Sequence, residues 1–122
     1  DVVLFTGDLV NNVVEEMDQW KSIFSSIKAK EGVFSVLGNH DYGDYVKWDS
    51  AEAKQTNLNS LKNLQGQMAW NLLLNEHHFI ERDKQRLAIV GVENWGENGF
   101  KKAGDLDAAC SGVLKEDFKI VP

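Results

Sequence analysis

Cysteine, proline and long apolar runs are almost missing from this sequence, and their scarcity excludes several classes of protein. Cys110 is the only cysteine among 122 residues, so the chain is not a secreted scaffold held together by internal disulfides. Pro122 is the only proline, and no segment combines Pro, Gly and Ser, which excludes a collagen-like repeat, a mucin-like stalk and an internal linker. No run approaches the ~18 apolar residues that cross a bilayer, so we expect no membrane span in this segment.

Basic residues are fewer than acidic residues in this sequence. Thirteen Lys and Arg residues stand against nineteen Asp and Glu residues, which gives a net charge of −6. An acidic surface repels a phosphate backbone, so we expect no nucleic-acid partner. The apolar fraction of 43% and the charged fraction of 26% are those of an ordinary globular protein, which excludes a disordered tail.

Both ends of the sequence look interrupted. Residues 2–5 form an apolar run that is typical of a strand buried on both faces, and residues 118–121 read as another strand one residue before the end. Natural domains usually begin and end in exposed polar segments. We therefore expect this chain to be part of a larger protein.

The first third of the chain predicts a strand, a helix and a second strand. We expect strands at residues 2–5 and 33–37 and a helix over about 13–28, where apolar residues recur at steps of four and three. Asn12 and Glu15 fit a capping box at the start of this helix. Such a unit makes the two strands parallel neighbours with a right-handed crossover. The apolar stripe of the helix consists of Val13, Met17, Trp20, Phe24 and Ile27.

The rest of the chain predicts helices and strands that complete an α/β sandwich with a mixed sheet. We expect a helix that Asp49 and Glu52 begin and that ends around Gly66. The other expected elements are a polar loop at 38–49, a strand at 72–74, a hairpin of 79–81 and 87–92 around a charged turn at 82–86, a loop at 91–99, a short helix at 105–111 and the strand at 118–121.

Two glycine-led loops, residues 6–8 and 38–41, leave the carboxyl ends of the first two strands. Ligands bind at this edge of open α/β sheets, and the glycines allow the backbone to turn sharply and approach a ligand closely. A carboxylate, an amide and an imidazole at one edge offer the oxygen and nitrogen ligands of a divalent ion. The side chains that we expect to meet there are those of Asp8, Asn39, His40 and Asp41.

These loops carry two motifs that resemble the calcineurin-like metallophosphoesterases. Gly7-Asp8-Leu9-Val10-Asn11 matches the family's G-D-x-x-[DN], and Gly38-Asn39-His40-Asp41 matches its G-N-H-[DE]. Residues 36–48 look like the single-domain bacterial branch of the superfamily. The resemblance implies that residues 1–122 are an incomplete domain of this kind, part of a four-layer α/β/β/α sandwich with mixed sheets.

The resemblance also implies a role for each motif residue. Asp8 would bridge two metal ions and Asn39 would ligate the second through its side-chain carbonyl. His40 would sit near the leaving group, and Asp41 would hold the His40 ring by accepting a hydrogen bond. Positions around the metals or in the substrate loop fall to Gly7, Asn11, Gly38 and Tyr42, although Asn11 is equally explained as a helix cap with Asn12.

The implied activity is hydrolysis of a phosphomonoester or phosphodiester by a hydroxide that two divalent ions, Mn, Fe or Zn, activate. The implied substrate is a phosphorylated small molecule or a phosphorylated lipid. The family also uses an Asp-x-His before the first motif and a Gly-His and a Gly-His-x-His after the second, and this sequence contains none of them. The chain alone is therefore expected to be inactive, and its metal content alone stays open.

The second interpretation is a non-catalytic α/β interaction module derived from this fold. Unpaired sheet edges would let such a chain associate with itself or with a partner. Three aromatic residues, Tyr42, Tyr45 and Trp48, either line a pocket beside His40 or pack under the loop.

Several other polar or reactive residues are expected to be structural. His77 and His78 are adjacent in a strand, so they point to opposite faces and do not share a metal. Residues 93–95, at the end of the hairpin, either approach the cleft at the strand ends or form a turn with a packed Trp95, and we favour the turn. Cys110 is expected to be a small buried hydrophobe.

Overall fold

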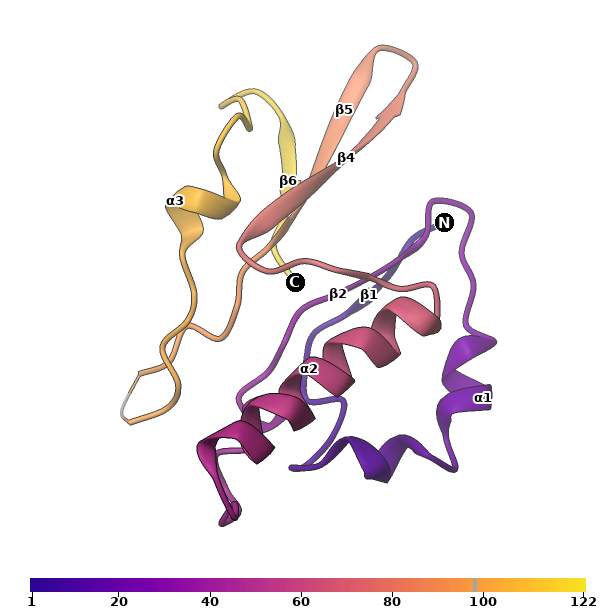
Figure 1. Ribbon diagram of the computed structural model, residues 1–122. Helices are drawn as coiled ribbons and strands as arrows, with labels where there is room; N and C mark the ends of the chain where they lie inside the picture. The colour runs from indigo at the N-terminus through magenta and orange to yellow at the C-terminus, as the bar shows by residue number, and fades with distance from the viewer. Residues whose placement is uncertain (98) are drawn as a thin grey trace.

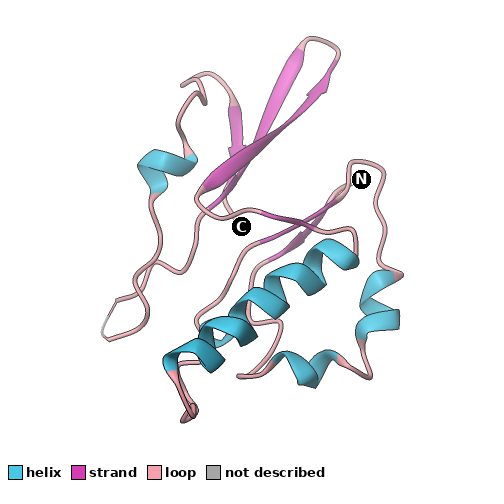
Figure 2. Cartoon of the chain, in the orientation of Figure 1, coloured by secondary structure: helices cyan, strands magenta, loops and turns pink. Residues whose placement is uncertain are grey.

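The computed structural model describes residues 1–97 and 99–122 and arranges them in two sheets flanked by helices (Figure 1). The first sheet joins β1, β2 and β3, and the second joins β4, β5 and β6, as the strand colouring of Figure 2 shows. The elements, in chain order, are β1 (Val3–Phe5), the 3-10 helix η1 (Val14–Met17), α1 (Lys21–Ser25), β2 (Val33–Ser35), the 3-10 helix η2 (His40–Tyr42), α2 (Ala51–Gln67), β3 (Asn71–Leu72), β4 (Glu76–Arg82), β5 (Gln85–Gly91), α3 (Leu106–Ala109) and β6 (Phe118–Ile120).

The first sheet is parallel and the second is mixed. Strand β1 pairs with β2 in parallel, with Val3 opposite Val33, which confirms the predicted parallel neighbours. Strand β3 pairs with the other side of β2, also in parallel. In the second sheet β4 and β5 form an antiparallel hairpin, and β6 lies parallel to β5.

Alternate side chains of the two central strands define four layers. Val33 of β2 packs with the helical layer around Leu61 of α2, whereas Phe34 points to the other face and packs against Ile89 of β5. Ala88, next to Ile89, packs on the outer face of the second sheet with Ala109 of α3. Because neighbouring residues of a strand face opposite sides, each strand contributes to two cores. The order is therefore helix, sheet, sheet, helix, as predicted.

The helix predicted over 13–28 is wrong in its continuity. The segment instead forms the short helices η1 and α1. Its start is held by other parts of the molecule: the Val14 amide donates to Asn57 of α2 at 2.8 Å, and the Asn57 side chain donates to the Asn12 carbonyl at 3.0 Å. These contacts outweigh the local preference for one long helix. The predicted stripe is nevertheless largely buried, with Met17, Phe24 and Ile27 in the helical core and Trp20 exposed.

Two helix caps also differ from the prediction. Glu16, not Glu15, accepts the amides of Asn12 and Val13, at 2.9 Å each. Ser50, not Asp49, caps α2 by accepting the Ala53 amide at 3.1 Å. In both cases the carboxylate or hydroxyl one position further along the chain reaches the free amides.

The second half of the chain is close to its prediction. Helix α2 ends one residue beyond Gly66, and the expected helix at 105–111 is present but shorter, as α3 begins after its cap Asp105 and ends at Ala109. The hairpin is longer than predicted because only Asp83 and Lys84 form its turn, with φ of 50° and 65°. Strand β3 is shifted to Asn71–Leu72, since Leu73 packs into the core between the sheets.

Three other expectations can be followed in the same part of the chain. Residue 98 of the expected loop 91–99 lies outside the described residues. Cys110 is partly buried beside Ala109, in keeping with a small hydrophobe. Among the described residues, no helix combines the length and the apolar character that crossing a bilayer requires.

Candidate functional site

The two glycine-led loops meet at the carboxyl ends of β1 and β2. The His40 amide donates to Asp8 Oδ1 at 3.0 Å, and the Asp8 amide donates to Asp41 Oδ2 at 2.9 Å. Some thirty residues separate these partners in the chain, and the parallel pairing of β1 with β2 brings them together. The structure thus brings Asp8, His40 and Asp41 together, through contacts of the backbone amides of His40 and Asp8 with the two carboxylates.

Both loops need glycine because their backbones almost touch. Gly7 has a φ of +97°, and a Cβ placed on it would lie 2.4 Å from the Gly38 nitrogen. A Cβ on Gly38 would lie 2.1 Å from Asp8 Oδ1. Asp8 itself has a positive φ of 56°, so its carboxylate is aimed by a backbone conformation that few residues adopt. The predicted roles of Gly7 and Gly38 as sharp turns thus have a direct steric cause.

Asp41 does not hold the His40 ring, and this part of the prediction is wrong. Its carboxylate is fully buried and accepts the amides of Asp8 and Gly38 at 2.9 Å each and that of Val10 at 3.2 Å. Burial raises the pKa of the Asp41 carboxyl above its usual value, against the lowering effect of these amides. A buried side chain of this kind does not contact a substrate, so Asp41 organises the two loops.

His40 is oriented by the backbone of the first loop instead. Its Nδ1 lies 3.0 Å from the Asn11 carbonyl oxygen, so a proton on Nδ1 donates there and leaves Nε2 available. The Tyr45 ring packs on the imidazole, with centroids 4.5 Å apart. Asn11 thus contributes through its carbonyl. Its amide donates to Glu16 at 2.9 Å, which replaces the cap that we expected from Asn11 and Asn12.

Asp8 and Asn39 carry side-chain oxygens at this edge of the sheet. Asn39 Nδ2 donates to the Tyr45 hydroxyl, which leaves the Asn39 carbonyl oxygen for another partner. Asp8 uses Oδ1 for the His40 amide and retains Oδ2. A carboxylate and an amide oxygen fit a divalent ion in kind. Two such oxygens are too few to hold an ion, and within residues 1–97 and 99–122 no three His, Cys, Asp or Glu side chains cluster closely enough to complete a metal site.

A cleft of about 480 Å³ opens beside these donors. Its lining includes Asp8 and Asn39 together with residues 93–95, which follow β5. The expectation that 93–95 form a turn with a packed Trp95 is wrong, since Trp95 is 52% exposed and lines the cleft. The other alternative, that these residues at the end of the hairpin approach the cleft, is the one that the structure shows.

Of the three aromatic residues near His40, Tyr42 and Trp48 pack under the loop, and Tyr45 lies on the His40 ring outside the lining of the cleft. Tyr42 is buried and donates its hydroxyl to Glu93 at 2.9 Å, and burial together with Glu93 raises the pKa of that hydroxyl. Trp48 donates to the Gly43 carbonyl at 2.7 Å and packs under the loop. Only Tyr45 of these three is exposed, at the His40 ring.

The two histidines of β4 are structural, as predicted. His77 Nδ1 lies 2.8 Å from the Ala109 carbonyl of α3. The His78 ring packs on Phe34 in the core between the sheets, 4.8 Å between centroids. They face opposite sides of the second sheet and do not share a ligand.

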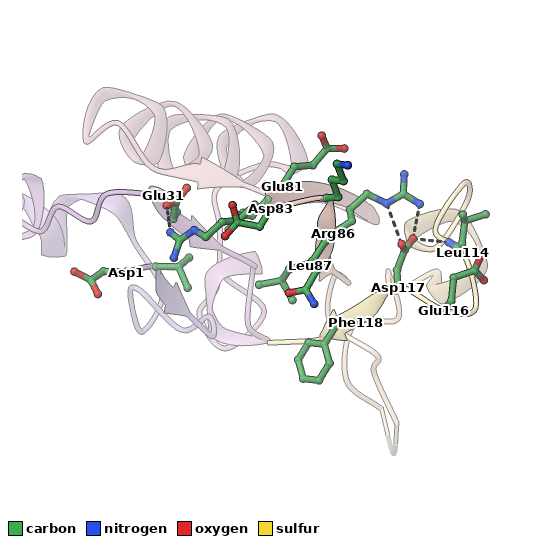
Figure 3. Close-up of a pocket in the computed structure, with 15 residues that line it drawn as sticks. Asp1, Glu31, Glu81, Asp83, Arg86, Leu87, Leu114, Glu116, Asp117 and Phe118 are labelled. Atoms are coloured by element: carbon green, nitrogen blue, oxygen red, sulfur yellow. Dashed lines mark hydrogen bonds and ion pairs between the residues drawn. The ribbon is translucent and has the colours of Figure 1, made fainter.

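A second groove, of about 1100 Å³, lies by the hairpin tip and β6 (Figure 3). Its two arginines are engaged by carboxylates. Arg86 donates to Asp117 through two nitrogens, at 2.9 and 2.6 Å, and Arg82 donates to Glu31 at 2.7 Å. Although this groove is larger than the cleft, it offers no unpaired arginine to an anion.

The layer order, the parallel β1–β2 pair and the two strand-end loops define a metallophosphoesterase-type α/β fold. The family model for calcineurin-like phosphoesterases matches residues 1–115. The chain therefore belongs to the calcineurin-like phosphoesterase family.

Three relatives give the comparison more detail. The chain is 24% identical over 126 residues to the uncharacterised metallophosphoesterase YkoQ of Bacillus subtilis, covering 99% of this chain and 43% of that protein. It is 42% identical over 50 residues to the UDP-2,3-diacylglucosamine pyrophosphatase LpxG of Chlamydia muridarum, and 44% identical over 50 residues to LpxG of Chlamydia trachomatis. Each of these two matches covers 40% of this chain and 15% of the relative. The chain thus spans less than half the length of these relatives. No solved structure gives a significant match.

Proposed function

We propose that the protein to which this chain belongs is a metal-dependent phosphoesterase that hydrolyses a phosphomonoester or a phosphodiester. The observation that carries the proposal is the hydrogen bond from the His40 amide to Asp8 Oδ1, because it fixes the two loops at one sheet edge beside a cleft. Family membership supports hydrolysis of a phosphoester in general. The chlamydial relatives, named pyrophosphatases of a diacylated sugar nucleotide, support a phosphorylated lipid or small molecule as substrate.

In this proposal Asp8 and Asn39 hold two divalent ions, Mn, Fe or Zn, together with donors that this chain does not supply. Bound ions of this kind would polarise the phosphate oxygens and would lower the pKa of a bound water molecule to near neutral pH. Asp8 contributes the negative charge that offsets the repulsion between two cations. Asn39 is oriented by Tyr45, with its carbonyl oxygen left for a ligand.

His40 donates a proton to the leaving oxygen from Nε2 as the imidazolium, and the neutral ring that remains keeps its proton on Nδ1. The contact of Nδ1 with the Asn11 carbonyl, which accepts a hydrogen bond from the proton that stays on Nδ1, holds the ring in the orientation that this transfer needs. Asp41 acts at a distance from the substrate by keeping the amides of both loops in register.

The proposal is tested on the full-length protein with Mn²⁺ and an aryl phosphate. Asp8→Ala and Asn39→Ala are expected to abolish metal-stimulated hydrolysis. Asp8→Asn is the sharper variant, because it keeps an oxygen for the His40 amide while removing the charge that a metal needs. Asn59→Ala, an exposed asparagine of α2, is the matched control and should leave turnover unchanged. Unchanged turnover in Asp8→Asn and Asn39→Ala would contradict the proposal.

His40→Ala separates metal binding from proton transfer. It removes the imidazole but keeps the backbone amide that Asp8 accepts, so the rate should fall while metal content persists. Wholesale loss of metal, measured by elemental analysis, would show that His40 has been given the wrong role.

The alternative is an interaction module without catalysis. Phe118 of β6, a strand paired on one side, is 70% exposed, which supports association through a sheet edge. Elemental analysis of the full-length protein distinguishes the two: about two equivalents of metal favour the enzyme, and none favours the module. The chain 1–122 alone should be inactive and should self-associate, and a clean monomer in sedimentation velocity would contradict the second expectation.

A further inference from the structure

One buried contact joins the loop that carries Asn39 and His40 to the wall of the cleft that carries Trp95. Tyr42, which ends η2, is 4% exposed and donates its hydroxyl to Glu93 Oε1 at 2.9 Å. Glu93 lies two residues beyond the end of β5 and two residues before Trp95. The Tyr42–Glu93 bond therefore spans two segments that are fifty-one positions apart in the chain.

The other side of Glu93 is held by Asn75. The Asn75 side chain donates to Glu93 Oε2 at 3.2 Å, and its oxygen accepts the Glu93 amide at 3.0 Å. The same Asn75 oxygen accepts the Asp105 amide at 2.8 Å, and its nitrogen donates to the Ala103 carbonyl at 2.8 Å. One asparagine thus ties both ends of the segment from Glu93 to Asp105. Since both Glu93 oxygens are engaged, Glu93 acts through its neighbours.

Trp95 is the side chain that this arrangement presents to the cleft. It is about half exposed and lines the same cleft as Asp8 and Asn39. A Cβ on Gly104 would lie 3.2 Å from Trp95 Cε3, so the backbone of the segment supports part of the ring. When an apolar group covers an exposed indole that the backbone already holds in place, apolar surface leaves water and the free energy of binding becomes more favourable.

We propose that Glu93 is a positioning residue that fixes Trp95 in the cleft, and that Trp95 binds the apolar part of the substrate's leaving group. This inference rests on the proposed phosphoesterase function and adds a substrate class to it. The preferred substrate is a phosphate ester whose leaving group is aromatic or aliphatic. A small, strongly hydrated leaving group gains nothing from Trp95.

The test compares two substrates in the full-length protein with Mn²⁺. Trp95→Ala and Glu93→Ala are each expected to raise KM for p-nitrophenyl phosphate about fivefold while kcat stays within about twofold. KM for glycerol 2-phosphate should not change. Glu93→Gln keeps an acceptor for Tyr42 and should recover part of the lost KM, and Tyr42→Phe should resemble Glu93→Ala in direction.

A matched control and a binding measurement separate positioning from general stability. Asp117→Asn removes a hydrogen-bonded carboxylate of the second groove and should leave both KM values unchanged. Calorimetry should show that the wild type prefers phenylphosphonate to methylphosphonate and that Trp95→Ala has lost this preference. If p-nitrophenyl phosphate is hydrolysed but Trp95→Ala keeps its KM, the inference is overturned and the function stands. If the wild type hydrolyses neither substrate, the proposed function fails, and the inference fails with it.

Discussion

The two hollows of the molecule use their charged side chains in opposite ways. In the groove by the hairpin tip, Arg86 and Asp117 neutralise each other with two part-buried hydrogen bonds, and the Arg86 side chain is 28% exposed. At the loops beside the cleft, the Asp41 carboxylate is fully buried and its partners are backbone amides. Asp8 and Asn39, whose loops these amides belong to or adjoin, line the cleft.

The volume of a cavity therefore does not identify a functional site. The groove is more than twice as large as the cleft, at about 1100 Å³ against 480 Å³. A side-chain pair at the surface satisfies both partners and offers little to a ligand. A carboxylate that is bound by amides fixes the backbone around it, so that neighbouring side chains are held with free oxygens.

The largest difference between the two cavities is expected when the Asp41 carboxylate is removed. Asp41→Ala leaves three backbone amides without their acceptor and is expected to lower the free energy of unfolding by about 3–5 kcal/mol. Asp117→Ala should cost clearly less, because water can replace the lost partner of Arg86. Urea denaturation of the full-length protein measures both. Equal losses in the two variants would contradict the proposed difference between the hollows.

A single added methyl group at Gly38 is expected to separate the two glycine-led loops. Gly38→Ala places a Cβ against Asp8 Oδ1, and we expect a destabilisation of about 2 kcal/mol with at least a tenfold loss of metal-stimulated hydrolysis. Gly66→Ala is the matched control, because nothing lies within 4 Å of a Cβ there and the residue is in α2. It should stabilise the protein by about 0.5–1 kcal/mol with unchanged activity.

The two aspartates should also differ in the sign of their pH dependence. Burial raises the pKa of the Asp41 carboxyl, so the stability that is linked to this shift is complete below the ordinary value of 3.8 and is lost as pH rises through the raised pKa, while the contacts with the three amides persist. The hydrogen bond from Arg86 lowers the pKa of Asp117, so its contribution is present above 3.8 and is lost as pH falls through the lowered pKa. Denaturation midpoints of Asp41→Asn and Asp117→Asn, each subtracted from the wild type between pH 3 and 7, measure both signs. Two difference curves of the same sign would refute this assignment.

The smallest effect belongs to the exposed ion pair of the groove. Arg82 is 62% exposed and its pair with Glu31 faces solvent. Arg82→Ala should change the free energy of unfolding by no more than about 0.5 kcal/mol, and the change should vanish in 1 M salt. A larger effect that persists in 1 M salt would contradict the description of Arg82 and Glu31 as an exposed, screened pair.

The sequence predicted the site well where chemistry is encoded locally. The two glycine-led motifs follow apolar runs, and the pairing of those runs as parallel neighbours is enough to bring Asp8 to His40. The same reasoning gave Asp41 the wrong partner, because a motif specifies that a carboxylate is present but not which of the nearby donors it accepts. In the structure Asp41 accepts three backbone amides, and the His40 ring contacts the Asn11 carbonyl instead.

The wall of the cleft shows the limit of local reasoning most clearly. Residues 93–95 carry no motif, and their place in the site depends on hydrogen bonds to Tyr42 and Asn75 from distant parts of the chain. The broken helix around η1 and α1 has the same origin, since Asn57 of α2 holds its start.

What the sequence determined by itself is therefore the order of the elements, the strand-end loops and the kind of donor atoms they carry, since these follow from apolar periodicity and from the need for glycine at close backbone approach. Only the tertiary structure decided which amides bind Asp41, what orients His40 and which segment faces Asp8 across the cleft. Such choices depend on contacts between residues far apart in the chain, and their geometry is fixed only when the layers have packed.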